Sequence, residues 1–453
     1  MLLSFTVENW KSFRDATTLT MIKTRELQHK ESIPVLKSYG VGVLPVAAIY
    51  GGNASGKTNL FQAIRFVRDF VVRQRDPDNG TGVDPFLLSN TARSGMTRFS
   101  VKFLAKDDVV YELAFSLDQE HVDDEKLVRM DGHREVTLYH RKLGAEKLVL
   151  DPSRPKSDQD HADFILHGTK ANQLFLANSI SQNVEWFRSA YDWFARSLML
   201  TSPMDYWGIL DSYVGDGKMA SMLRRLDTGV VRLESKKVSA EDAGLSPQLR
   251  DVLERELQKG KSINIPEKRS APRLVAHKDE LGGIAYNEIM ALHRTDDGDK
   301  TVGFHMSQES DGTLRLMDLL PAFINATSRS ARGVYVVDEL DRSLHTLLTK
   351  SLLQYYLSCC SPSTRSQLIF TTHDALLMDQ RLLRRDETWV TERERNGGSI
   401  LYSFSEFKDA RKDKDIRKSY LRGRLGGIPR ILLESTFDFP DSYDAEKGDA
   451  EKP

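Results

Sequence analysis

Gly51-Gly52-Asn53-Ala54-Ser55-Gly56-Lys57-Thr58 is the stretch of this 453-residue chain that decides its fold. It fits the pattern G-x-x-x-x-G-K-[ST] and lies between a β-prone run, Val46 to Tyr50, and a helical pattern, Asn59 to Val71. A strand, a glycine-rich turn and a helix in this order are typical of a P-loop, whose backbone N–H groups curl around phosphates at a helix N-terminus. The sequence therefore predicts an α/β fold with a phosphate-binding loop.

The side chains of this loop have distinct expected roles. Lys57 is expected to reach the β- and γ-phosphates of a nucleotide, and the Thr58 hydroxyl to join the shell of a Mg²⁺ ion. ATP and Mg²⁺ are therefore the predicted cofactors. The other residues of the loop expected to bind the nucleotide are Gly51, Asn53, Ala54, Ser55, Gly56 and Asn59.

A second acidic element lies far downstream, where the apolar run Val334 to Val337 ends in Asp338 and Glu339. A buried parallel strand would bring both acids to its carboxyl end. Asp338 is then expected to hold Mg²⁺ through water, and Glu339 to orient and polarise the attacking water. Two acids after a strand are also common as a plain helix cap, and it is the pairing with the P-loop that favours the catalytic interpretation.

A third element is the β-prone run Gln367 to Thr371, which is followed by His373 about thirty residues after the acids. Its position in the chain indicates a histidine that bonds the γ-phosphate and senses its loss. A lone histidine after a strand is otherwise more often an ordinary surface residue.

A fourth element, Ser310-Asp311-Gly312-Thr313, precedes an apolar-periodic helix running from Leu314 toward Phe323. Ser310 and Gly312 at a helix start offer a hydroxyl and free N–H groups to an anion. An ordinary helix cap explains the same residues, and the two interpretations remain open at this point.

The pattern of the rest of the chain predicts an ATPase head that is split by an insertion. Runs at Arg98 to Leu117 and Glu135 to Leu150 predict an antiparallel β layer, and the stretch from Asn172 to about Lys259 is predicted to be helical. We therefore divide the chain into an N-terminal half of the head (1–171), an inserted helical lobe with a connector (172–300), a C-terminal half (301–438) and a disordered tail (439–453). The predicted lobe carries an aromatic stripe at helical spacing, Trp186, Phe187, Tyr191, Trp193, Phe194 and Leu198, for which core packing is favoured over partner docking.

Composition sets limits on the partners. Lys and Arg total 64 against 65 Asp and Glu, so the net charge gives no argument for nucleic acid or membrane. The basic cluster Lys408 to Arg424 alternates with acids, which favours a solvated helix face over a phosphate contact. Cys359 and Cys360 are adjacent and indicate neither a disulfide framework nor a zinc site, and no targeting segment is recognised, so a cytoplasmic protein is expected.

The order of these four elements resembles that of the ABC-type ATPases, and the P-loop is similar to the GxNGxGKS/T form of the SMC and RecF branch. Asn53 to Asn59, Glu339 to His345 and Tyr420 to Pro429 are more closely similar to AAA-family ATP/GTP phosphatases of bacterial abortive-infection and phage-defence operons. These include RloA-like proteins and the ATPase subunit of PARIS systems. The resemblance covers most of residues 1–435, although only the nucleotide motifs are specific.

The resemblance implies the fold of an ABC-type head, with a mixed sheet, flanking helices and an antiparallel layer, that dimerises around ATP. Ser310 and Gly312 would then act on the nucleotide of the partner chain, and Glu339 to His345 would include a D-loop that crosses the interface. Three features depart from the family. Ser310-Asp311-Gly312-Thr313 is not the full LSGGQ sequence of transporters, and His345 stands where the D-loop of the family ends in Asp. Gln74 lies too close to the P-loop helix to be assigned as the Q-loop glutamine.

Three functional classes agree with these observations. The first is a sensor and regulatory ATPase of an antiviral system, which controls a separate effector such as a nuclease or toxin encoded nearby. The second is a RecF-like DNA-repair ATPase, and the third is a nucleotide-gated scaffold with negligible turnover, against which Glu339 argues. A coiled-coil SMC arm is excluded because no heptad run occurs, and about 80 residues after His373 are too few for an added nuclease domain.

Overall fold

The computed structural model describes residues 1–76, 78–132, 134–203, 213–257, 262–265, 273–279, 282–298, 300–328, 330–407, 416–423 and 426–427. Most of the basic cluster from Lys408, the residues from Ile428 to Pro429 and the predicted tail lie outside these ranges.

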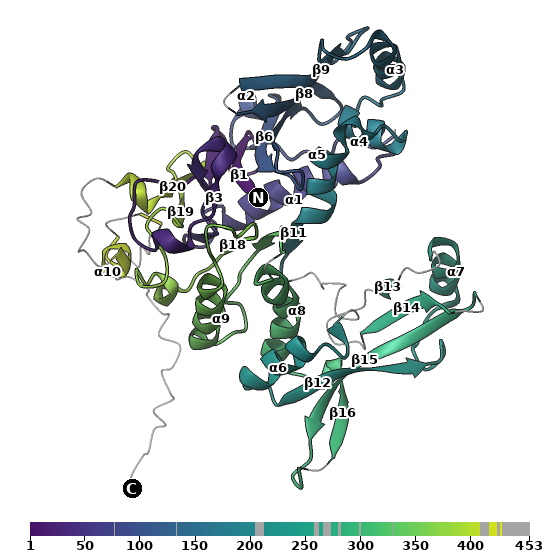
Figure 1. The fold of residues 1–453 in the computed structure, drawn as a ribbon, viewed down its shortest axis with the longest axis vertical. Helices are drawn as coiled ribbons and strands as arrows, with labels where there is room; N and C mark the ends of the chain where they lie inside the picture. Colours follow the sequence, from purple (N-terminus) through teal and green to yellow (C-terminus); the bar gives the residue numbers. More distant parts are fainter. Residues whose placement is uncertain are drawn as a thin grey trace, which may run out of the picture.

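A six-stranded sheet forms the centre of the head and has the order β11-β17-β18-β5-β19-β20 (Figure 1). Its first five strands are parallel, and only β20 runs antiparallel to its neighbour. The strands are β5 (Val46–Tyr50), β11 (Leu198–Thr201), β17 (Val334–Val337), β18 (Gln367–Thr371), β19 (Thr388–Arg393) and β20 (Ser399–Ser403). The carboxyl ends of β5, β17 and β18 therefore meet at one edge, as the sequence predicted.

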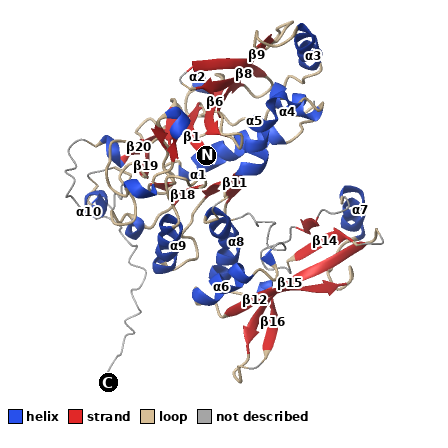
Figure 2. Ribbon diagram, viewed as in Figure 1, coloured by secondary structure: helices blue, strands red, loops and turns tan. Residues whose placement is uncertain are grey.

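A seven-stranded antiparallel layer covers one face of the head (Figure 2). Its strands, in spatial order, are β10 (Val149–Leu150), β9 (Arg134–Lys142), β8 (Val122–Asp131), β7 (Val110–Leu117), β6 (Thr97–Leu104), β1 (Leu2–Glu8) and β2 (Thr17–Thr20). A small pair, β3 (Val35–Leu36) and β4 (Val41–Gly42), stands beside it. The mixed sheet with an antiparallel layer and flanking helices confirms the predicted fold class of an ABC-type P-loop ATPase head.

Helices fill the space between and around the sheets. They are α1 (Lys57–Val72), α2 (Asn90–Arg93), α3 (Lys156–His167), α4 (Phe175–Ser181), α5 (Arg188–Asp192), α6 (Gly217–Arg225), α7 (Pro247–Glu256), α8 (Asp311–Ala326), α9 (Thr346–Ser358) and α10 (Ile416–Leu421). None of these helices is both long enough and apolar enough to cross a lipid bilayer.

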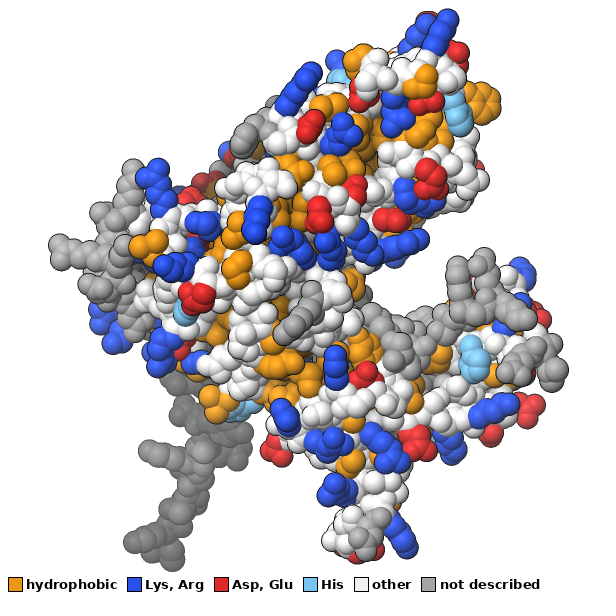
Figure 3. Space-filling view, viewed as in Figure 1, with side chains coloured by type: hydrophobic (Ala, Val, Ile, Leu, Met, Phe, Trp, Pro, Cys, Tyr) orange, Lys and Arg blue, Asp and Glu red, His pale blue; other side chains and the backbone are white. Residues whose placement is uncertain are grey.

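The inserted lobe is a β structure, so the prediction of a helical lobe is wrong for this region. A five-stranded sheet is formed by β12 (Val230–Val238), β13 (Ser262–Ile265), β14 (Leu274–Lys278), β15 (Ile284–Arg294) and β16 (Thr301–His305), and in the described part of the lobe α6 and α7 accompany it. Charged residues interrupt β12 on its exposed face, and its sequence VVRLESKKV therefore lacks the clean alternation that identifies a strand. The lobe stands apart from the antiparallel layer, with a wide notch between the two (Figure 3).

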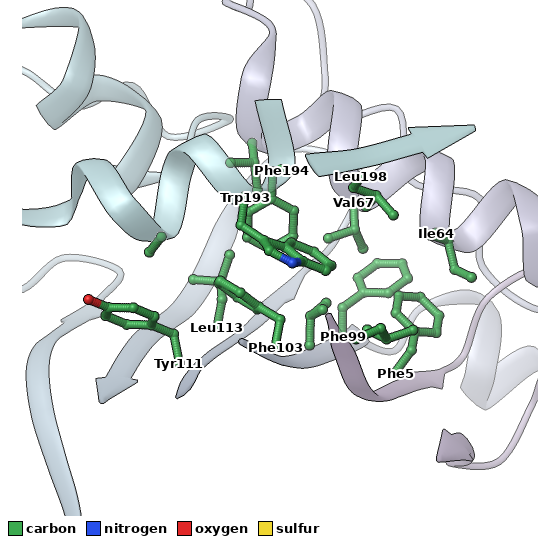
Figure 4. Close-up of a cluster of buried hydrophobic side chains, with 14 of the residues drawn as sticks. Phe5, Ile64, Val67, Phe99, Phe103, Tyr111, Leu113, Trp193, Phe194 and Leu198 are labelled. Atoms are coloured by element: carbon green, nitrogen blue, oxygen red, sulfur yellow. The ribbon is translucent and has the colours of Figure 1, made fainter. Parts of the chain in front are cut away.

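The aromatic stripe belongs to the head and not to the lobe. Trp193 stacks on Phe103 of β6 with ring centroids 4.3 Å apart, and Phe194 lies edge-on to the same ring (Figure 4). Both side chains are buried, as is Leu198, where the chain enters β11 in the central sheet. Core packing is therefore the role of the buried part of the stripe, and residues 175–201 are part of the ATPase head.

Two apolar cores meet at β5, because successive side chains of a strand point to opposite faces. Ala47 and Ile49 face the core that contains α1 and the antiparallel layer, whereas Val46, Ala48 and Tyr50 face the core that contains α8 and α9. The strand that leads into the P-loop is thus buried on both sides, as a central parallel strand should be.

Candidate functional site

The P-loop backbone takes a conformation that only small residues allow. Gly51 and Gly56 have φ angles of 151° and 115°, and a Cβ atom at Gly51 would lie 2.5 Å from Ser55 Oγ and from Thr391 O. A Cβ atom at Gly56 would lie 2.5 Å from Ser399 Oγ. Side chains at either position would push the loop out of its curve, so the glycines of the motif are required by close approach.

Lys57 lies inside the loop and is 6% exposed. Its ammonium donates hydrogen bonds to the carbonyl oxygens of Gly51 at 2.8 Å and Gly52 at 3.0 Å. Burial lowers the pKa of Lys57 to about 8, while the negative charge of Asp338 acts in the opposite direction. The loop therefore holds a desolvated cation whose charge is available to an anion.

Asp338 follows β17 and is 4% exposed. Thr371, at the end of the neighbouring strand β18, donates a hydrogen bond of 2.6 Å from Oγ1 to Asp338 Oδ1. Burial raises the pKa of Asp338, and hydrogen bonds from Thr371 and from Thr58 counteract part of this effect. Thr58 and Asp338 are thus within hydrogen-bonding reach of each other, although 280 residues separate them in the sequence.

Glu339 is the next residue and has a left-handed φ of 49°, which is uncommon for a residue with a side chain. Its N–H donates to Thr371 Oγ1 at 2.8 Å. Its carboxylate is 3.1 Å from the guanidinium of Arg342. The unusual backbone angle is maintained by contacts on both sides of the residue, which turn the side chain toward the P-loop cavity.

A cavity of about 580 Å³ lies in front of the P-loop. The predicted residues that line it are Asn53, Ala54, Ser55, Gly56, Lys57, Thr58, Asn59, Glu339 and His373. Burial lowers the pKa of His373, and the positive charge of Lys57 lowers it further, so its imidazole is neutral over a wider pH range than a free histidine. The fold therefore brings three of the four predicted elements to one place.

Ser310 and Gly312 do not line this cavity. Ser310 is exposed and caps α8, with its Oγ accepting a hydrogen bond of 3.1 Å from the N–H of Thr313. Gly312 abuts the segment after Glu339, because a Cβ atom there would lie 2.8 Å from Ser343 O. Within one chain, the helix start and the P-loop do not share a binding cavity.

Other residues of the site were not predicted from the sequence. Lys11, Ser12 and Arg393 line the same cavity, and Ser12 Oγ accepts a hydrogen bond from Asn59 at 2.8 Å. They come from the turn after β1 and from the end of β19, which only the folded chain brings beside the P-loop. Gln74, left unassigned from the sequence, lines a separate hollow on the outer side of α1.

Arg315 is a further residue that the motifs did not identify. It is 2% exposed, and its Nη2 donates to the carbonyl oxygens of Asp338 at 2.9 Å and Glu339 at 3.0 Å. A signal for it did exist, because an arginine between Leu314 and Leu316 stands in an otherwise apolar buried run. A buried arginine needs carbonyl or carboxylate partners, which predicts a polar contact at this position.

The residues around the cavity fit a nucleotide and a magnesium ion. The curved loop with glycines at positions 51 and 56, the cation of Lys57 and the helix N-terminus of α1 suit phosphate groups. The Thr58 hydroxyl and the Asp338 carboxylate are oxygen donors of the kind that Mg²⁺ prefers. Among the described residues there is no cluster of three or more His, Cys, Asp or Glu that would form another metal centre.

Residues 46–379 match the family described as "AAA domain, putative AbiEii toxin, Type IV TA system". This match spans well over half of the sequence. The chain belongs to this family. A search of curated proteins found no match for the AAA-domain chain.

Solved structures of ATPase heads are similar to this AAA-domain protein over most of its length. The SMC head domain from Thermotoga maritima is 14% identical, covers 89% of this chain and 98% of its own, and gives a TM-score of 0.33. The recombination mediator protein RecF with ATP is 12% identical, covers 89% and 99%, and gives a TM-score of 0.36. Because both scores are below 0.5, the assignment of the fold rests on the strand order and the site of the chain itself.

Proposed function

We propose that the protein is a Mg²⁺-dependent ATPase that dimerises around ATP and acts as the sensor and regulatory subunit of an antiviral system. The observation that carries the first part is the convergence of Lys57, Asp338, Glu339 and His373 on the P-loop end of the central sheet. Family membership supports ATPase activity, since this family is defined by an AAA domain.

Hydrolysis needs the γ-phosphoryl group to be held in place and its charge to be stabilised. Lys57 and the N–H groups of the P-loop bind the phosphates. Thr58 and Asp338 would hold Mg²⁺, which would supply positive charge to neutralise the phosphate oxygens. Glu339 orients the attacking water and accepts its proton as the terminal phosphoanhydride bond breaks. His373 donates a hydrogen bond to the γ-phosphate and is released when that group leaves.

The position of Ser310 supports a site that two chains share. Ser310 and Asp311 are exposed, Gly312 is half-buried, and all three lie outside the cavity of their own chain. An exposed helix start is well suited to bind the phosphates of a second chain. ATP is then enclosed between the P-loop of one chain and Ser310 and Gly312 of the other, and the protein is a homodimer or a larger homo-oligomer built from such pairs.

The regulatory role rests on the family description and on the chemistry of the chain. The description names a toxin and a type IV toxin–antitoxin system. Outside the nucleotide site, the described residues offer no metal cluster that could cut nucleic acid. We infer that ATP binding and hydrolysis change the shape of the dimer, and that this change holds or releases a separate effector, a nuclease or toxin encoded nearby.

This proposal is tested by expressing the gene alone and with its genomic neighbours, followed by phage challenge and pull-down of the chain. Protection is expected only when a neighbouring gene is present, and the product of that gene is expected to co-purify. Full protection by the chain alone would remove the effector from the account.

One observation favours a second function, that of a RecF-like ATPase acting on DNA. A hollow of about 470 Å³ is lined by the cations Lys11, Arg65, Arg73 and Arg75 and by two aspartates, Asp69 and Asp76. Lys11 also lines the nucleotide cavity, so the two sites adjoin. A hollow with more cations than acids suits the phosphate backbone of nucleic acid. A many-fold rise in ATP hydrolysis on adding DNA, with no co-purifying effector, is the result that this function predicts.

A further inference from the structure

Arg315 connects the two halves of the proposed composite site within one chain. It lies on the second turn of α8, five residues after Ser310, or about 7.5 Å along the helix axis. Its guanidinium ends at the carbonyl oxygens of Asp338 and Glu339. One buried side chain therefore bridges the helix start that faces a partner and the residue that orients the attacking water.

The backbone of Glu339 is held by this bridge. Its N–H is fixed by Thr371 of β18 and its carbonyl oxygen by Arg315 of α8. A residue with a φ of 49° keeps this angle only where its surroundings determine it. These two bonds hold the peptide groups on both sides of the Glu339 Cα, and therefore the position of the Cβ from which the carboxylate extends.

A second contact couples the same two segments. Gly312, at the start of α8, packs against the carbonyl oxygen of Ser343, which lies four residues after Glu339. A displacement of the helix start therefore reaches the segment that carries Glu339 both through Arg315 and through the backbone at Gly312. Packed helices transmit such displacements because protein interiors are dense.

We propose that Arg315 is a positioning residue that relays engagement of Ser310 at one ATP site to Glu339 at the other. Engagement of Ser310 by the ATP held on the partner's P-loop fixes α8, and Arg315 then fixes the catalytic carboxylate that serves the chain's own ATP. Each chain therefore hydrolyses its nucleotide fastest when both sites are filled. This inference rests on the composite site described under the proposed function.

The test uses heterodimers in which one subunit carries Glu339→Gln, so that both sites bind ATP but only one hydrolyses it. That site takes its P-loop and Glu339 from the intact subunit and Ser310 from the Glu339→Gln subunit. Arg315→Met, which keeps side-chain length but removes both donors, is placed in either subunit. Arg315→Lys, which keeps one donor group, serves as a second variant in case the methionine variant fails to fold.

The relay predicts that Arg315→Met in the subunit carrying Glu339 of the surviving site lowers kcat roughly tenfold to a hundredfold, the range seen when an orienting partner is removed. Binding of a fluorescent ATP analogue should change less than about twofold, and Arg315→Lys should recover part of the rate. The same change in the subunit that supplies only Ser310 should leave the rate unchanged.

A matched control is Arg365→Met, because the guanidinium of Arg365 also donates to backbone carbonyls, those of Pro362, Thr364 and Val35, but away from Glu339. It should leave kcat unchanged in both placements. Three results overturn the relay. They are a fall in kcat only when Arg315→Met is in the subunit that supplies Ser310, an equal fall in both placements, and no fall in either. A heterodimer that forms but does not turn over before any change at Arg315 contradicts the composite site itself, and the relay with it.

Discussion

The P-loop end and the Ser310 end of the head differ in how much of a binding site one chain forms there. Lys57 is 6% exposed and has both of its hydrogen-bond partners inside its own loop, and Thr58, Asp338 and Glu339 lie around it. Ser310 is exposed, and among the described residues its hydroxyl bonds to Thr313 in the first turn of its own helix. The comparison shows that the fold of one chain preorganises the phosphate-binding half, whereas Ser310 and Gly312 lie outside the cavity of their own chain.

The largest loss of ATP hydrolysis is expected from Lys57→Ala, at the P-loop end. It removes the fixed cation of the preorganised half, so turnover should fall roughly a thousandfold or more, with weaker ATP binding as well. Steady-state hydrolysis and binding of a fluorescent ATP analogue by the purified variant measure both quantities. Unchanged turnover with an unchanged melting temperature would contradict the role of the loop.

A smaller effect is expected from Glu339→Gln, which keeps the size of the side chain but removes the carboxylate. Turnover should fall about a hundredfold, the magnitude for loss of a general base, while ATP binding is retained. Because the nucleotide is then bound without being hydrolysed, dimers should accumulate in ATP and Mg²⁺, as seen by size-exclusion chromatography with light scattering. Turnover at the wild-type rate would remove Glu339 from the mechanism.

A still smaller effect follows from pH. The pKa of Lys57 is lowered to about 8, so in the chain without nucleotide the ammonium loses its proton as the pH rises through this value. Phosphate binding requires the charged form, and the dissociation constant for ATP should therefore rise roughly tenfold between pH 7 and pH 9 and change little below pH 7.

The control for this prediction is Lys57→Arg, whose guanidinium stays charged throughout this range. Its affinity for ATP, whatever its value at pH 7, should not fall between pH 7 and pH 9. An equal loss of affinity in the variant would assign the pH dependence to another group.

The central sheet could be predicted from the sequence because its strands are short apolar runs that end in polar motifs. Val334 to Val337 and Gln367 to Thr371 have the bounds of β17 and β18, and the helix expected after Gly312 is α8. These strands are buried on both faces, so their composition alone identifies them. The position of the site at their carboxyl ends follows from the parallel arrangement.

The β structure of the lobe and the residues that join the site from other segments could not be predicted from the sequence, and the reasons are physical. Strands such as β12 and β16 are exposed, and their sequences carry charged or polar residues where a buried strand carries apolar ones. Trp193 and Phe194 lie at helical spacing, but the sequence does not say that they pack on Phe103 of the antiparallel layer. Lys11 and Arg393 are far from the P-loop in the sequence, and tertiary contacts bring them to the cavity.

The central claim is that the site is completed by a second chain, and subunit mixing tests it most directly. Ser310→Arg should stop hydrolysis without weakening ATP binding to the P-loop of the same chain, and Lys57→Ala is inactive for a different reason. Mixed in equal amounts, half of the dimers carry one intact composite site, so activity should return to at most roughly a quarter of the wild-type rate. Absence of any activity in the mixture, with heterodimers shown to form, would contradict the account.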